Sequence, residues 1–165
     1  RATKNHNELA VSPEDYEKAK LQVLEMWMGD ESPTRLSCLE NMLKNVLRGD
    51  HAQGCTFSDS CQKDFISVGP LGDVYPCGEF GGEKEFRYGN INESSIEEIL
   101  SSSLRKKLLS RVEGIEECRS CDYQRICHGG CMFEAYVNGD IMGKDPYCRA
   151  YRSIYRAISE RIFKN

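Results

Sequence analysis

Eight cysteines between positions 55 and 148 restrict what this chain can fold into more than any other sequence feature. The full set is Cys55, Cys61, Cys77, Cys118, Cys121, Cys127, Cys131 and Cys148, of which four form the compact motif CxxCx5CxxxC. A ninth cysteine, Cys38, lies upstream in a helical pattern, where we expect a small buried apolar residue. Eight thiolates are the number that two four-cysteine metal centres require.

Composition and charge narrow the class of protein. The 165 residues suffice for one domain, or for one domain with a fragment of another. A net charge of -4, with 22 basic and 26 acidic residues mixed along the chain, argues against nucleic-acid binding. No apolar run is long enough to cross a membrane, and residues 1–9 carry no signal-peptide pattern. We therefore expect a cytoplasmic protein, whose reduced thiols bind metal or act in catalysis.

Helical periodicity flanks the cysteine region. A helix capped by Ser12 is predicted over residues 13–28, with Val23, Met26 and Trp27 on its apolar face, and a second helix over residues 36–47. A third is predicted from a cap at 94 or 95 through residue 112, with apolar positions recurring every three or four residues. A fourth follows Asp145 and Pro146 and runs nearly to residue 165.

The middle of the chain predicts little regular structure. Short strands at residues 65–68 and 74–75, around a glycine-rich turn, indicate a hairpin that leads to Cys77. The segment from Gly49 to Gly89 is rich in Gly, Asp, Ser and Cys, a composition that needs cross-links or metal to hold one shape. The expected fold is α+β: a small irregular domain with a β-hairpin and flanking helices.

The cysteine spacings favour iron–sulfur clusters. Cys118, Cys121 and Cys127 can surround one cluster, and two glycines let the main chain approach closely before Cys131. In two-cluster ferredoxins the last cysteine of such a compact run binds the other cluster. This reasoning gives two ligand sets, Cys55, Cys61, Cys77 and Cys131 in one and Cys118, Cys121, Cys127 and Cys148 in the other.

Two alternatives involve the same cysteines. Zinc could stabilise the fold without a redox role. However, the cysteine spacings are wider than those in the paired CxxC knuckles of zinc ribbons, and His128 is not at a usual ligand spacing. We expect His128 to pack or to bond to the main chain. A disulfide framework would require a secreted protein and would leave one thiol over.

The cysteine pattern resembles the auxiliary-cluster SPASM region of radical S-adenosylmethionine enzymes. Cys61, Gly72 and Cys77 match the first half of its signature, the run from Cys118 to Cys131 matches the core, and Cys148 matches the end. The resemblance implies two fully protein-ligated 4Fe-4S clusters held by the two sets above. Residues 51–165 would form this domain, and residues 1–50 would be the helical tail of, or bridge from, a partial TIM-type barrel.

The resemblance also implies an activity. Related enzymes include anaerobic sulfatase maturases and peptide-crosslinking maturases, which abstract hydrogen from a C–H bond of a peptide or protein. The full-length enzyme would use S-adenosylmethionine, a third 4Fe-4S cluster and an electron donor such as flavodoxin or ferredoxin. The chain has no CxxxCxxC triplet for that third cluster, so we expect it to be part of an enzyme.

One position departs from the sulfatase maturases. They carry an aspartate after the third cysteine, whereas Gly78 and Glu79 follow Cys77 here, so we assign no catalytic residue and do not expect sulfatase maturation. Two other functions remain open: a zinc-stabilised interaction module and a standalone ferredoxin-like electron carrier.

Overall fold

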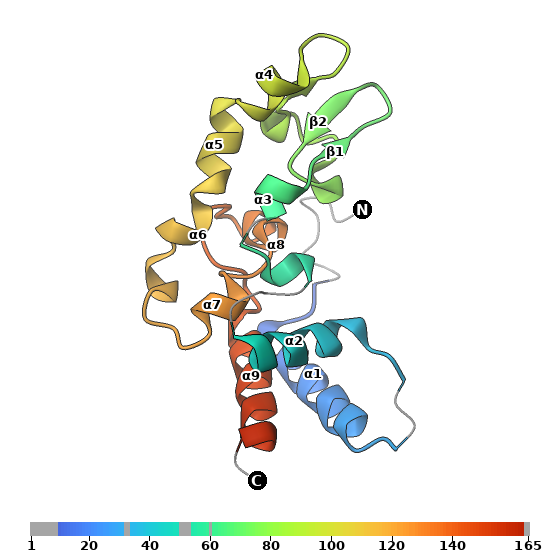
Figure 1. Cartoon of the computed structure of the whole chain (residues 1–165), viewed down its shortest axis with the longest axis vertical. Coiled ribbons are helices and arrows are strands. Elements are labelled where there is room, and N and C mark those ends of the chain that lie inside the picture. Colours follow the sequence, from blue (N-terminus) through green and yellow to red (C-terminus); the bar gives the residue numbers. More distant parts are fainter. Residues whose placement is uncertain (1–9, 32–33, 50–53, 60, 164–165) are drawn as a thin grey trace.

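The computed structural model describes residues 10–31, 34–49, 54–59 and 61–163. Its α-helices are α1 (Pro13–Met28), α2 (Ser37–Arg48), α3 (Cys61–Asp64), α4 (Ile96–Leu100), α5 (Ser103–Leu109), α6 (Arg111–Gly114), α7 (Gln124–Cys127), α8 (Met132–Val137) and α9 (Cys148–Phe163). The strands are β1 (Ser67–Val68), β2 (Asp73–Tyr75) and β3 (Gly89–Asn90). Short 3-10 turns are η2 (Cys55–Phe57), η3 (Gly78–Phe80), η4 (Lys84–Phe86) and η5 (Glu116–Cys118). The molecule is elongated, with α1, α2 and α9 at one end and the sheet at the other (Figure 1).

The helical end forms around α9. Ser12 caps α1 as predicted, because its hydroxyl accepts the main-chain N–H of Asp15 at 3.1 Å and Pro13 occupies the first turn. Both α1 and α2 pack on α9. The buried residues of this core include Leu24, Leu39, Met42, Phe57, Ile126, Cys127, Tyr151, Ile154, Tyr155 and Ile158. Because α1, α2 and α9 share one core, the first and last helices of the described chain are held together by apolar burial.

Two expectations for these helices were wrong. Val23 and Met26 are 41% and 75% exposed, and Leu24 is buried instead. Cys38 is exposed rather than buried. It lies about 100° around the helix from Leu39, which together with Met42 faces the core, so the thiol stays outside that buried face.

The sheet end contains the predicted hairpin and one unpredicted strand. β2 pairs antiparallel with β1, in the register Ser67 with Tyr75, and also with β3. Gly72 allows the tight turn, because its φ is +89° and a Cβ there would lie 2.4 Å from the Asn92 side-chain nitrogen. A second core, defined by Val74, Tyr75, Phe80, Phe86, Tyr88, Ile99, Leu108, Met132 and Phe133, covers this sheet.

The third predicted helix is broken into three. Ser95 caps α4 in a capping box with Glu98, as the sequence indicated. The helix then ends, because the Ser101 hydroxyl bonds back to the Glu98 carbonyl and Ser102 caps the new helix α5. After a further break, α6 begins at Arg111 and places this residue in the interior.

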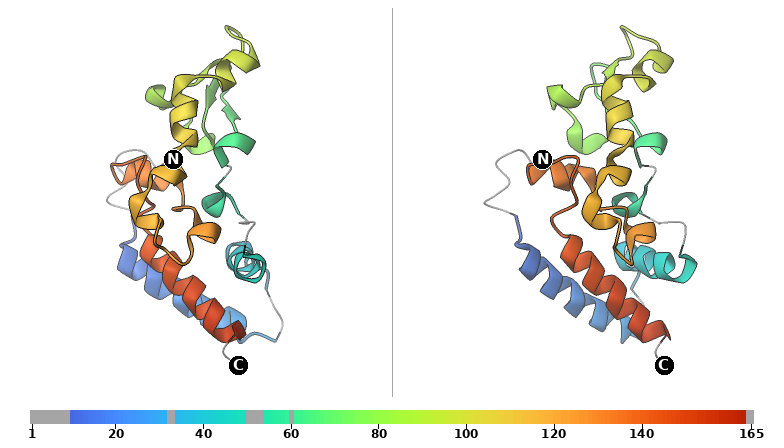
Figure 2. Two further views of the ribbon diagram at one scale, coloured as in Figure 1. Left: turned by 60° about the vertical axis from the view of Figure 1, so that its left-hand side comes forward. Right: turned by 90° about the vertical axis from the view of Figure 1, so that its left-hand side faces the viewer.

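The cysteine-bearing turns lie between the two cores. In the side views, the segment between α6 and α9 occupies the middle of the molecule, between the helical end and the sheet end (Figure 2). η2 contacts α7, and α3 contacts α5, so short elements far apart in sequence meet here. Within the described ranges, no helix has the length and apolar character needed to cross a membrane.

Candidate functional site

A cavity of about 310 Å³ is lined by the first predicted ligand set. Its four cysteines come from separate elements: the start of η2, the start of α3, the residue before η3 and the residue before α8. They are Cys55, Cys61, Cys77 and Cys131. The remaining wall is largely apolar and includes Phe65, Ile66, Phe80, Met132 and Phe133. Thiols facing an apolar space of this size form a suitable donor set for a compact sulfur-rich cofactor.

Main-chain amides are directed at two sulfurs of this set, those of Cys77 and Cys131. Burial raises the pKa of Cys77 and that of Cys131, the latter to about 11. Hydrogen bonds from the following residues oppose this: Glu79 and Phe80 donate to Cys77, and Glu134 and Phe133 to Cys131. Such donors stabilise the thiolate, which is the form that binds metal.

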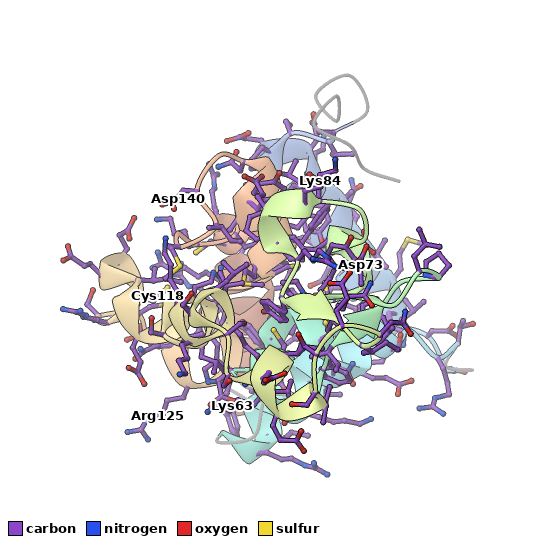
Figure 3. The ribbon with its side chains drawn as sticks, turned by 90° about the horizontal axis from the view of Figure 1, so that it is seen from above. Lys63, Asp73, Lys84, Cys118, Arg125 and Asp140 are labelled. Carbon is purple, nitrogen blue, oxygen red and sulfur yellow. The ribbon has the colours of Figure 1, made fainter. Side chains whose placement is uncertain are left out.

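The cysteines of the second predicted set influence one another electrostatically. Burial is the main cause that raises the pKa of Cys118, Cys127 and Cys148, to about 12 for Cys127. For each of these three thiols, other members of the set raise the pKa further, so these sulfurs lie within electrostatic range of one another. Figure 3 shows Arg125 of α7 pointing away from the molecule, whereas Cys127 of the same short helix is buried.

The structure thus places Cys55, Cys61, Cys77 and Cys131 around one cavity, and Cys118, Cys121, Cys127 and Cys148 within electrostatic range of one another. Ligation of a cluster stays a prediction. Among the residues that the structure describes, no three His, Cys, Asp or Glu side chains converge closely enough to bind a single metal ion. Cys38 belongs to neither set and lies beside the Lys20 ammonium, 3.9 Å away.

His128 has the role expected of it. Its Nδ1 lies 2.6 Å from the carbonyl oxygen of Phe57, so the ring bonds to the main chain of η2. The two residues that follow His128 are glycines with positive φ, +79° at Gly129 and +73° at Gly130. A Cβ on Gly129 would lie 2.5 Å from Ile115, which shows why the chain needs glycine before Cys131.

Two buried charged residues were not anticipated from the sequence. Arg111 is 4% exposed and donates to the carbonyl oxygens of Gly129, Gly130 and Gly143. Asp145 is 0% exposed, and burial raises its pKa. The sequence signal that could have indicated burial of Arg111 is its position three residues after Leu108, on an apolar helical face. For Asp145 the signal is its position just before a predicted helix.

Sequence comparisons relate the cysteine region to known proteins. Residues 55–122 match the SPASM iron–sulfur cluster-binding domain. The chain is 24% identical over 159 residues to the cysteine-type anaerobic sulfatase-maturating enzyme of Clostridium perfringens, covering 93% of the chain and 42% of the enzyme. It is 30% identical over 89 residues to the PqqA peptide cyclase of Xanthomonas axonopodis pv. citri, covering 51% of the chain and 23% of the cyclase. The chain therefore spans less than half the length of these relatives.

Solved structures show the same fold. The structure of native anSMEcpe with bound AdoMet superimposes with a TM-score of 0.76 at 23% identity, covering 94% of this chain and 43% of that one. The form with bound AdoMet and Kp18Cys peptide gives a TM-score of 0.69 at 20% identity, with the same coverage. Residues 55–122 are thus similar to the SPASM iron–sulfur cluster-binding domain, and the chain is homologous to anaerobic sulfatase-maturating enzymes and PqqA peptide cyclases.

Proposed function

We propose that this chain is the auxiliary-cluster portion of a radical S-adenosylmethionine enzyme that modifies a ribosomally made peptide or protein in the cytoplasm. The observation that carries the proposal is the convergence of four cysteines from four separate elements on one cavity. Two 4Fe-4S clusters would be bound, one by Cys55, Cys61, Cys77 and Cys131 and one by Cys118, Cys121, Cys127 and Cys148. Residues 51–165 would form the cluster domain and residues 1–50 the link to the catalytic barrel.

The residues around the first set would control the local environment. Phe65, Phe80 and Phe133 line the cavity and would exclude water, while main-chain amides stabilise the thiolates. When bound, the clusters would supply one-electron transfer, including removal of the electron that a peptide radical releases as it loses a proton. On the likeness to radical maturases, we propose C–H abstraction followed by crosslinking or oxidation as the reaction class.

We infer a peptide substrate from the names of similar proteins rather than from a pocket of this chain. One structural neighbour contains a bound Kp18Cys peptide, and the PqqA cyclase is named for its peptide. We propose a peptide other than a sulfatase, because Gly78 and Glu79 follow Cys77 and the Glu79 side chain is exposed. Glu79 is not assigned as a base.

A basic surface beside the second set would bind the electron carrier. Cys148 lines a hollow together with Lys144, Arg149, Arg152 and Arg156. Arg149 is ion-paired to Glu17 at 2.7 Å, and Lys144 to Glu117 at 3.4 Å, while Arg152 and Arg156 are exposed. Positive charge next to a cluster ligand suits an acidic donor such as flavodoxin or ferredoxin.

Three cysteine variants of the full-length protein, purified without oxygen, test the cluster proposal. Cys61→Ala and Cys121→Ala should each remove about four iron atoms and about four sulfides, because each breaks one set. Cys38→Ala is the matched control and should lose neither. Loss of about one zinc ion per variant, without iron, would instead support a zinc-stabilised module. Full clusters in a protein unable to cleave S-adenosylmethionine would support a standalone electron carrier.

A further inference from the structure

Arg111 lies near a cysteine of each set. Its Nη1 donates at 3.1 Å to the carbonyl oxygen of Gly130, the residue before Cys131 of the first set. A Cβ placed on Gly129 would lie 3.8 Å both from Arg111 Nη2 and from the sulfur of Cys118, a member of the second set. The guanidinium therefore lies close to the main chain that precedes Cys131 and close to the position of the Cys118 sulfur.

The charge of Arg111 is held by main-chain oxygens rather than by a carboxylate partner. Nη2 donates at 2.7 Å to the Gly143 carbonyl and at 3.2 Å to that of Gly129. A guanidinium stays protonated in proteins, and a buried one requires nearby negative charge. The acidic groups within electrostatic range of it are Cys131, Cys61, Asp145 and Cys118, so cysteines of both sets would be near its charge when ionised.

Asp145, a second buried charged residue near Arg111, contacts the main chain of both cysteine sets. Its carboxylate accepts the main-chain N–H of Cys131 at 2.9 Å, the N–H of Tyr147 at 2.8 Å and the hydroxyl of Tyr151 at 3.1 Å. Its carbonyl accepts the N–H of Cys148 at 3.0 Å. One buried aspartate thus fixes a cysteine of the first set and a cysteine of the second.

We propose that Arg111 and Asp145 form an electrostatic bridge that sets the reduction potentials of both centres together, Arg111 raising them and Asp145 lowering them. The inference rests on the proposed function, because it concerns the clusters that the two sets would hold. A buried positive charge favours the reduced, more negative state of each cluster, and a buried carboxylate disfavours it. The residues act as positioning and tuning groups rather than as catalytic ones.

The test is a redox titration of the full-length, anaerobically purified protein, followed by electron paramagnetic resonance. Arg111→Gln should lower both potentials, with the one-electron reduction equilibrium of each centre falling about tenfold, which corresponds to about 59 mV. Asp145→Asn should shift both in the opposite direction, and Arg111→Lys should stay near the wild type because it keeps the charge. Arg119→Gln is the control, since Arg119 follows Cys118 but is exposed and screened by solvent.

The outcomes separate this inference from the proposed function. Protein with full iron whose potentials do not move in Arg111→Gln would overturn the bridge, as would a shift confined to one centre. Equal shifts in Arg111→Lys and Arg111→Gln would assign the effect to geometry and would also overturn it. If Arg111→Gln does not retain its clusters, Asp145→Asn decides, because a merely structural role predicts no rise in potential. Wild-type protein that binds no iron would refute the proposed function itself.

Discussion

The main-chain amide of Cys131 donates to the buried carboxylate of Asp145 across 2.9 Å. This bond ties the loop of one cysteine set to the start of α9, which carries Cys148 of the other set. The two sets are therefore joined through a single polar residue as well as through the apolar cores.

Asp145→Ala should destabilise the fold strongly. The change leaves the Cys131 and Tyr147 amides and the Tyr151 hydroxyl without their buried acceptor, and Arg111 loses a nearby negative charge. Removal of one member of a buried polar network of this kind costs about 3 kcal/mol, which should lower the Tm by several degrees. Thermal unfolding followed by circular dichroism under anaerobic conditions measures this.

Asp140→Ala provides the comparison for that variant. Asp140 also accepts a main-chain amide, that of Met142 at 3.0 Å, but it is exposed. Its loss should change the unfolding free energy by about 0.5 kcal/mol. Equal Tm changes in the Asp145 and Asp140 variants would contradict the role given to burial.

Gly130→Ala should displace Cys131. A Cβ at this position would lie 2.4 Å from the Cβ of Asp145, and the φ of +73° already disfavours a side chain. We expect loss of about four iron atoms, those of the first set, in an anaerobic metal analysis. Gly139→Ala is the matched control, because its φ is +102° but no atom lies within 4 Å of the added Cβ. Full iron in Gly130→Ala would show that the close approach is not needed.

Charge reversal at Arg152 and Arg156 should slow electron delivery. The double variant Arg152→Glu, Arg156→Glu places negative charge beside Cys148, where we propose that an acidic carrier binds. Stopped-flow reduction by a flavodoxin at low salt should slow about tenfold or more, and added salt should reduce the difference. Lys106→Glu, on the exposed face of α5, should leave the rate unchanged. A rate unaffected by the double variant would move the docking site elsewhere.

Local signals predicted the elements whose ends carry their own caps. The cap at Ser12 and the capping box at Ser95 both formed, because they depend only on neighbouring residues. The break between α4 and α5 could not be read from apolar periodicity, since Leu100 and Leu104 continue the helical spacing. Local hydroxyl bonds at Ser101 and Ser102 decided it. Strand β3 has two residues and no pattern of its own, so only its pairing with β2 defines it.

For the candidate site, the sequence predicted the cysteines but not the buried charged residues. Cysteine number and spacing led to the prediction of two ligand sets, through the rule that the last cysteine of a compact run binds the other cluster. The structure places the four cysteines of the first set around one cavity. Arg111 and Asp145 were missed, because their roles depend on contacts between residues that are far apart in sequence. The acceptors of Arg111 are 18 to 32 positions away, and Cys131, whose amide donates to Asp145, is 14 positions away. Burial of a charged residue is a property of the tertiary structure, and composition does not reveal it.

We propose that eight thiolates hold two separate iron–sulfur clusters. Crystallography of the anaerobically prepared full-length protein, with an anomalous map measured at the iron edge, tests it most directly. We predict one four-iron peak among Cys55, Cys61, Cys77 and Cys131, and a second among Cys118, Cys121, Cys127 and Cys148. A single-atom peak, a peak bound by cysteines of both sets, or sulfur atoms joined in pairs without iron would contradict the account.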